Sequence, residues 1–236
     1  MRKLKPFLIS TAPRCVAVYS RAKTFVGSVV RPSAFLENTF TSIYQENLWG
    51  DTESVSGPGS TIRETTRLRN ELPTLLKEIG ATSMLDAPCG DFNWLSKTEL
   101  PLEMYIGADI VPDLIAQNQK LYANEQRDFV LRDITRAELP RVDVILCRDC
   151  FIHFSYRHIA ATIRNFQRSK SRYLLTNTYL SWSQNSDIST GAFRPLNLQL
   201  PPFNFPPPRK LISEKDSQQE ALYYNKSLGL WELADL

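Results

Sequence analysis

Three acidic residues in the middle of the chain have the spacing expected of ligand-binding acids in an α/β sheet. Asp86, Asp109 and Asp133 each follow a short apolar run, and 23 and 24 residues separate them. Repeated strand–helix units produce such spacing and bring the carboxyl ends of the strands to one edge, where ligands bind. A carboxylate ending the second strand can accept hydrogen bonds from both hydroxyls of a ribose. The alternative is that these acids only cap the helices that follow them.

The loop after the first acid discriminates between nucleoside cofactors. It reads Asp86-Ala87-Pro88-Cys89-Gly90-Asp91, with one glycine where a dinucleotide site has three. A glycine-rich phosphate loop is also not expected in a chain whose 15 prolines outnumber its 9 glycines. Asp91 would repel a pyrophosphate. S-adenosylmethionine has no phosphate and carries a positive sulfonium and an α-ammonium group, so the acidic loop favours it over NAD.

The same residues resemble the motifs of class I S-adenosylmethionine-dependent methyltransferases. Met84–Asp91 resembles the first motif, Ile106–Asp109 the second, and Arg132–Ile134 the acidic segment that contacts adenine. Residues 142–154 resemble the fourth-strand motif, and residues 210–236 a closing hairpin. Pro88 and Phe92 depart from the family pattern, because glycine normally occupies these positions. The resemblance implies cofactor contacts at these positions: Asp86, Pro88, Gly90, Asp109, Ile110, Asp133, Ile134 and Arg148.

A turn upstream of the first motif extends the resemblance. Ser56–Ser60 is similar to the N-terminal extension of a bacterial methyltransferase subgroup with an Asp-Ala-Pro-Cys-Gly-Asp first motif. Placed at a helix N-terminus, Gly57 and Ser60 would offer backbone N–H groups to the carboxylate of the cofactor. The same residues also form an ordinary Gly-Pro turn that needs no ligand.

Methylation of a hydroxyl needs a base close to the acceptor. His153, just beyond the fourth predicted strand, is the candidate base, and Asp149 would orient either His153 or the acceptor. The alternative is a hydrogen-bonded histidine buried under the next helix. A zinc site at Cys147, Cys150 and His153 is disfavoured, since Cys147 ends an apolar strand and no second cysteine pair exists. No metal is therefore expected.

Residues 177–208 are predicted to form an insertion on the acceptor side. The segment mixes polar and aromatic side chains, as a carbohydrate site does: Asn177, Asn185, Asp187, Arg194, Asn197, Tyr179, Trp182, Phe193, Phe203 and Phe205. A proline-stiffened loop packed on the sheet would have the same composition.

The elements that must position these residues follow from hydrophobic periodicity. Strands are expected at 83–86, 104–109, 129–131, 142–147 and 172–176, with a hairpin of 210–213 and 228–233 at the sheet edge. A capping box at Thr61 starts a helix that Gly80 ends. A second helix starts near Pro112, with Leu114, Ile115 and Leu121 on one side, and Ser155 caps a third helix. Residues 37–59 are expected to form polar loop and short turns. The fold class is α/β, a Rossmann-like doubly wound, mostly parallel sheet with a C-terminal antiparallel hairpin.

Charge divides the chain into an arm and a domain. Residues 1–36 hold seven of the 28 basic residues and none of the 25 acidic ones, so the domain at 37–236 is net acidic and nucleic-acid binding is not expected. The basic arm could contact an anionic membrane surface, serve as a transit peptide or be a loosely ordered start. No apolar run is long enough to span a bilayer, and four cysteines suggest a reducing, cytoplasmic location, with peripheral membrane contact left open.

These inferences converge on a single-domain methyltransferase that uses S-adenosylmethionine to methylate oxygen on a small-molecule or carbohydrate acceptor. A non-catalytic binding or scaffold module with the same cofactor fold, and an NAD-linked oxidoreductase, remain as alternatives. The sequence leaves the acceptor and the oligomeric state open.

Overall fold

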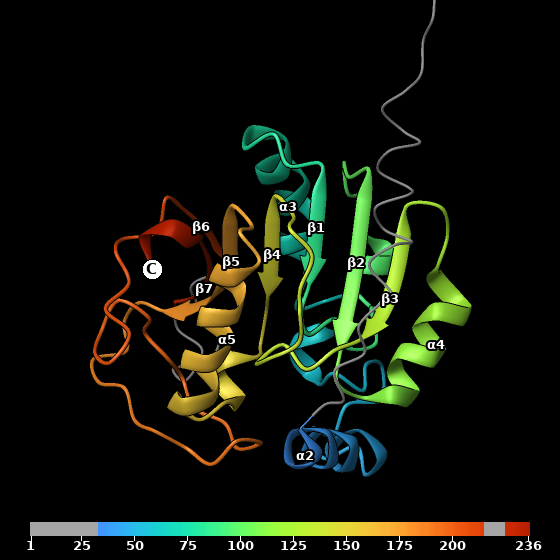
Figure 1. The fold of residues 1–236 in the computed structure, drawn as a ribbon, viewed down its shortest axis with the longest axis horizontal. Helices are drawn as coiled ribbons and strands as arrows, with labels where there is room; N and C mark the ends of the chain where they lie inside the picture. The colour runs from blue at the N-terminus through green and yellow to red at the C-terminus, as the bar shows by residue number, and fades with distance from the viewer. Residues whose placement is uncertain (1–32, 215–224) are drawn as a thin grey trace, which may run out of the picture.

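A seven-stranded mixed sheet forms the centre of the computed structural model, which describes residues 33–214 and 225–236 (Figure 1). The strands are β1 Ser83–Asp86, β2 Met104–Asp109, β3 Arg127–Leu131, β4 Val144–Cys147, β5 Tyr173–Tyr179, β6 Lys210–Ser213 and β7 Lys226–Glu232. Their order is β3-β2-β1-β4-β5-β7-β6. The first five pair in parallel, and β7 lies antiparallel between β5 and β6. The predicted fold class and the C-terminal hairpin are confirmed.

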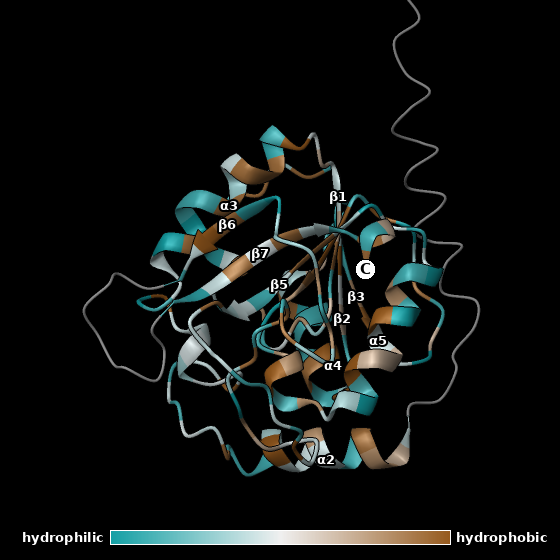
Figure 2. Cartoon of the chain, turned by 90° about the vertical axis from the view of Figure 1, so that its left-hand side faces the viewer, coloured by the Kyte–Doolittle hydropathy of each residue, from teal (hydrophilic) through white to brown (hydrophobic). Residues whose placement is uncertain are grey.

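Alternation along the strands builds a separate hydrophobic core on each face of the sheet. In β1, Met84 faces one core and Leu85 the other, and both are fully buried. Hydrophobic residues accordingly run along the central strands, whereas the helices carry both kinds of residue (Figure 2). One core is covered by α3 and α4, the other by α5 and the 177–208 segment.

Three helices follow the sequence signals, with two differences in detail. They are α3 Thr66–Glu78, α4 Pro112–Tyr122 and α5 Tyr156–Arg168. The Thr61 hydroxyl accepts from the Glu64 N–H at 3.3 Å, but the chain continues in turns, so the N-cap of α3 is Thr65, four residues later than predicted. Leu121 is 65% exposed and does not share the buried side of α4, which corrects that expectation. Ser155 caps α5 by accepting from the His158 N–H, as predicted.

The prediction that residues 37–59 form only loop and turns was wrong, because α2 spans Ala34–Gln45. Leu36, Phe40 and Ile43 recur at helical spacing on one side of α2, and Leu36 and Ile43 are buried. The helix lies across the carboxyl ends of the strands, beneath the sheet in Figure 1. Residues 1–32 of the predicted basic arm lie outside the described residues. Within the described ranges, no helix is both long and apolar enough to cross a membrane.

Candidate functional site

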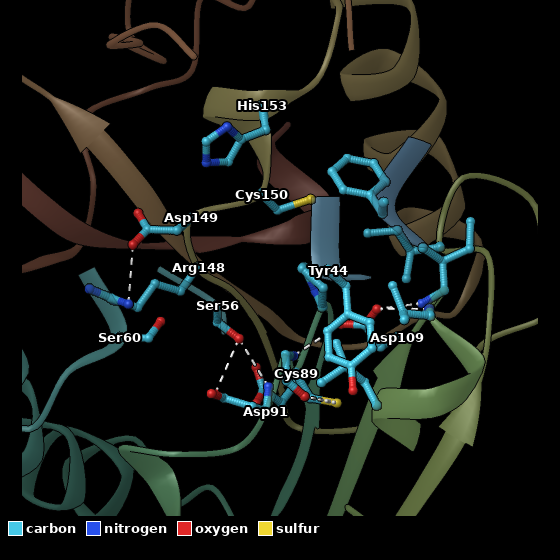
Figure 3. A pocket seen from close by; sticks show the side chains of 18 of the residues that line it. Tyr44, Ser56, Ser60, Cys89, Asp91, Asp109, Arg148, Asp149, Cys150 and His153 are labelled. Carbon is cyan, nitrogen blue, oxygen red and sulfur yellow. Dashed lines mark hydrogen bonds and ion pairs between the residues drawn. The ribbon is translucent and has the colours of Figure 1, made fainter. Parts of the chain in front are cut away.

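A cavity of about 1060 Å³, counting its open mouth, lies where β1, β2 and β4 end and α2 crosses them (Figure 3). The strand order reverses around β1, between β2 and β4, which is where ligands bind in doubly wound sheets. Every predicted site residue lines this cavity except Gly57. Residues far apart in the sequence, from Leu36 to Phe154, therefore share one site.

Asp109 ends β2 in the floor of the cavity and is 6% exposed. One carboxylate oxygen accepts from the N–H groups of Ile110 at 2.7 Å and Val111 at 3.1 Å, and the other accepts from that of Gly90 at 3.0 Å. Burial raises the pKa of Asp109 despite these three hydrogen bonds, which oppose the rise. The three bonds occupy three of about four acceptor positions of a carboxylate.

Asp86 ends β1 beside Asp109 and is 3% exposed. Burial and the neighbouring Asp109 charge raise its pKa to about 7, although a hydrogen bond from the Tyr105 hydroxyl, at 2.6 Å, and the Arg148 charge act in the opposite direction. Two buried acids thus lie side by side in a cavity with too little positive charge to ionise both at low cost.

The loop after β1 takes its shape from Gly90 and Phe92, which both have left-handed backbone angles, with φ of 53° and 57°. A Cβ on Gly90 would lie 2.2 Å from the Ser56 hydroxyl oxygen, so only glycine fits there. Phe92 adopts the same conformation although it is not glycine. Its ring is buried among the rings of Tyr105, Tyr122 and Phe129, at centroid distances of 5.0 to 5.2 Å. Packing therefore replaces the glycine that the family pattern has at this position.

Asp91 holds the upstream segment against the loop. Its carboxylate accepts from the Ser54 hydroxyl at 2.8 Å, the Val55 N–H at 3.0 Å and the Ser56 hydroxyl at 3.2 Å. This segment leads into the short 3₁₀-helix Pro58–Ser60. Ser60 lines the cavity, but the Gly57 N–H donates to the Ser54 carbonyl and its own carbonyl accepts from Ser60. Gly57 itself does not line the cavity, so a cofactor contact at this residue stays a prediction.

Asp133 lines the cavity, but its own turn and the start of α2 occupy its carboxylate. One oxygen accepts from the N–H and hydroxyl of Thr135, at 3.0 and 2.6 Å; the other accepts from the Ser33 N–H at 2.9 Å and pairs with Arg136 at 3.3 Å. Ile134, next in the chain, contributes an apolar side chain to the cavity wall. Turns rather than a helix follow Asp133, so its carboxylate holds this turn and the start of α2 while it lines the cavity.

A cluster of four charges, of which Arg148, Glu214 and Lys226 are buried and Asp149 is partly buried, borders the cavity beyond β4. Arg148 donates to Glu214 at 2.6 Å and 3.2 Å, to the Gly59 carbonyl at 2.8 Å and to Asp149 at 3.1 Å. Lys226 pairs with Asp149 at 2.7 Å and with Glu214 at 3.2 Å. Burial by itself would raise the pKa of Asp149, but the charges of Arg148 and Lys226 outweigh it and hold that pKa well below its usual value.

Asp149 owes its place to Asn177. It has a left-handed φ of 52°, and its N–H donates to the Asn177 side-chain oxygen at 2.5 Å. The Asn177 amide in turn donates to Glu214. Asp149 is thus a fixed anion with two cationic partners.

His153 lines the cavity from the 3₁₀-helix Phe151–His153. Its Nδ1 lies 2.9 Å from the Ala192 carbonyl oxygen, which can only accept, so Nδ1 carries the proton. Burial lowers the pKa of His153, although the Ala192 carbonyl and Asp149 act in the opposite direction. The neutral ring therefore keeps an unprotonated Nε2.

The polar side chains of the 177–208 segment bond to the protein itself. Arg194 donates to three backbone carbonyls at 2.8 to 2.9 Å, and Asn185 and Asn197 bond the backbone of the same segment. Asp187 caps α5 by accepting from the Tyr156 N–H at 2.7 Å. Tyr179 and Phe205 are buried in a core. The structure matches the alternative of a loop packed on the sheet, and the predicted carbohydrate contacts of these residues find no support in it.

Comparison with solved structures identifies the architecture. A Burkholderia thailandensis 1,6-didemethyltoxoflavin-N1-methyltransferase, with bound 1,6-didemethyltoxoflavin and S-adenosylhomocysteine, is 13% identical, with 96% of this chain and 92% of that chain covered and a TM-score of 0.55. The Synechocystis PCC 6803 magnesium protoporphyrin IX methyltransferase with bound S-adenosylhomocysteine is 12% identical, with coverages of 84% and 98% and a TM-score of 0.52. A bacterial Hen1 methyltransferase domain is 10% identical, with coverages of 71% and 98% and a TM-score of 0.53.

The fold is the Rossmann-like methyltransferase fold. No protein-family model and no curated protein sequence matches the chain. At these identities the likeness concerns the fold alone.

Within this methyltransferase fold, the sequence did not reveal several residues of the site. Glu214 and Lys226 complete the charge cluster from the hairpin strands, and Trp49, Phe40 and Tyr44 form the wall opposite the strand ends. No local pattern marks the first two, since each acts only through partners distant in sequence. The apolar spacing of α2 was a usable signal for Phe40 and Tyr44, whereas Trp49 lies beyond the end of this helix. The three buried cysteines are Cys89, Cys147 and Cys150, and no cluster of metal-binding side chains occurs in residues 33–214 and 225–236.

Proposed function

We propose that this chain is an S-adenosylmethionine-dependent methyltransferase. The observation that supports it best is the pair of buried acids, Asp86 and Asp109, in one cavity at the switch point of a methyltransferase fold. Burial raises the pKa of both acids, so a ligand that brings positive charge to them would be favoured here. A ligand with a sulfonium and an α-ammonium group supplies that charge, whereas a pyrophosphate would add to the deficit.

The residues present fit this cofactor. Asp109 has an acceptor position left for a ribose hydroxyl beside its three backbone donors. Ile110 and Ile134 offer apolar contacts to adenine, and Asp86 with the Pro88–Gly90 loop faces the amino-acid portion. Four of the five N–H donors of Arg148 have partners among the described residues, which leaves one for a carboxylate. When bound, the cofactor supplies an electrophilic methyl group.

We further propose that the acceptor atom is oxygen and that His153 removes its proton. The Ala192 carbonyl fixes the tautomer with Nε2 unprotonated, and burial favours the neutral ring. Asp149 does not hydrogen-bond His153 among the described contacts; its fixed negative charge instead stabilises the imidazolium that forms. The acceptor is a small molecule on this proposal. Membrane contact of residues 1–36 and a cytoplasmic location stay predictions, as does the domain division into 1–36 and 37–236.

Calorimetry with S-adenosylhomocysteine and, separately, NAD distinguishes the candidate functions. We expect micromolar binding of the former, and a loss of about 10- to 100-fold in Asp109→Ala, since a charged hydrogen bond contributes about 1.5 to 3 kcal/mol. Asp113→Ala, on the exposed first turn of α4, is the matched control and should bind normally.

Tight binding of NAD without S-adenosylhomocysteine binding would establish the oxidoreductase alternative. If S-adenosylhomocysteine binds but S-adenosylmethionine is never converted with any acceptor, the chain is a cofactor-binding scaffold.

A further inference from the structure

The cavity has an aromatic wall in which Trp49 packs on His153. The ring of Trp49 lies 5.1 Å from that of His153 at an interplanar angle of 32°, and Phe193 lies 5.9 Å from His153 on the outside. Trp49 and His153 both line the cavity, and Phe193 is 40% exposed. The indole is larger than the imidazole that it contacts, and Trp49 is partly exposed.

Gly57 fixes this wall. It has a φ of 90°, and a Cβ on it would lie 3.2 Å from the Cβ of Trp49. The Gly57–Ser60 turn is itself tied to the charge cluster, because the Gly59 carbonyl accepts from Arg148. The turn that the sequence suggested as a cofactor contact thus supports the indole.

Few polar groups at this end of the cavity are available to an acceptor. Asp149 already pairs with Lys226 and Arg148. Asn185, Asn197 and Arg194 do not line the cavity, and they bond to backbone carbonyls and N–H groups of the protein. A sugar bound here would leave several hydroxyls without partners, whereas a flat apolar ring with one hydroxyl requires a single polar contact.

We propose that the acceptor is a planar aryl hydroxyl compound, which stacks on Trp49 beside His153 and donates its hydroxyl to His153 Nε2. This inference rests on the proposed function. The acceptor oxygen forms the O–CH₃ bond as the S–CH₃ bond breaks, the sulfonium becomes a neutral thioether, and the hydroxyl proton passes to Nε2 and then to water. A phenolic hydroxyl has a pKa of about 10, far closer to that of an imidazole than an aliphatic hydroxyl, whose pKa is near that of water at about 15.7.

The first test is a panel of acceptors, with S-adenosylhomocysteine formation and the methylated product measured for each. The aryl set contains 2-naphthol, catechol and 4-hydroxybenzoate; the comparison set contains methyl α-glucoside, glycerol and aniline. We expect turnover with a member of the aryl set, yielding its methyl ether. Turnover confined to the comparison set overturns the inference.

The second test is binding, which does not depend on turnover. Calorimetric titration of 2-naphthol into the protein saturated with S-adenosylhomocysteine should show a site that Trp49→Ala weakens at least tenfold and Trp49→Phe retains. Trp182→Ala is the control, because Trp182 is 39% exposed and does not line the cavity.

A third test concerns the base. His153→Gln should lower kcat at least a hundredfold with KM nearly unchanged.

The outcomes separate the two proposals. If S-adenosylhomocysteine binds normally but no aryl hydroxyl binds or reacts, the acceptor inference is overturned and the proposed function stands. If S-adenosylhomocysteine itself does not bind, the proposed function fails. Equal binding of 2-naphthol to wild type and Trp49→Ala would also overturn the role given to the wall.

Discussion

Cofactor affinity should depend on the ionisation of Asp86, whose pKa of about 7 lies within the range of ordinary assays. Below its pKa, the free protein holds this carboxyl group protonated, and a cationic cofactor binds best once the proton has left. From pH 6.0 to pH 7.5 the ionised fraction rises from about one-tenth to about three-quarters. Affinity should therefore rise about eightfold, or about 1.3 kcal/mol, with a proton released on binding at the lower pH.

The substitution Tyr105→Phe tests the cause. The Tyr105 hydroxyl donates to Asp86 at 2.6 Å and lowers its pKa, so removing the hydroxyl should move the midpoint of the affinity profile above pH 7. The ring itself stays packed against Phe92 and Phe129, at centroid distances of 5.0 and 5.8 Å, which keeps the fold intact. Asp86→Asn is the second variant, and its cofactor affinity should not rise with pH between 6.0 and 7.5, because the titrating carboxyl group is gone.

Isothermal titration calorimetry with S-adenosylmethionine is the assay, run in two buffers of different protonation enthalpy at pH 6.0, 6.5, 7.0 and 7.5. The difference between buffers measures the protons released. The range stops at pH 7.5 because an α-ammonium group begins to lose its proton near pH 8. A flat affinity profile in the wild type, or an equal slope in Asp86→Asn, would refute the reasoning.

Two further substitutions probe the loop and the charge cluster. Gly90→Ala should reduce cofactor affinity and stability, because its Cβ would lie 2.2 Å from the Ser56 hydroxyl oxygen. The control Gly80→Ala, with a φ of 64° and no atom within 4 Å of its Cβ, should cost only about 1 to 2 kcal/mol of backbone strain and leave cofactor affinity unchanged. Calorimetry measures the affinities, and urea denaturation measures the stabilities. Glu214→Gln should lower the free energy of unfolding by about 3 to 5 kcal/mol, since it leaves two buried cations facing one carboxylate. Glu78→Gln, which breaks a half-exposed pair, should change it by less than about 1 kcal/mol. Similar losses in Glu214→Gln and Glu78→Gln would contradict this account of the cluster.

The strand ends illustrate what periodicity can predict. Asp86 and Asp109 were placed correctly at the ends of β1 and β2. A short apolar run that ends in an acid is a local feature of the chain, so it can be seen in the sequence. The helix α2 was missed although Leu36, Phe40 and Ile43 have helical spacing, since its polar residues outnumber them and its partner surface is the cavity rim. The contact between the Gly57 turn and Trp49 was not predicted, because a Gly-Pro turn has the same sequence whether it meets a ligand or a tryptophan.

The sequence by itself determined the order of the acids at the strand ends, the single glycine of the loop after β1 and the place of His153 after β4, because each depends on neighbours a few residues away. The tertiary structure decided the rest. It joined Glu214 and Lys226 to Arg148 and Asp149, placed Trp49 against His153, and turned the polar side chains of the 177–208 segment toward the protein's own backbone. It also set the ionisation of Asp86, since burial and the proximity of Asp109 exist only once β1 and β2 lie side by side.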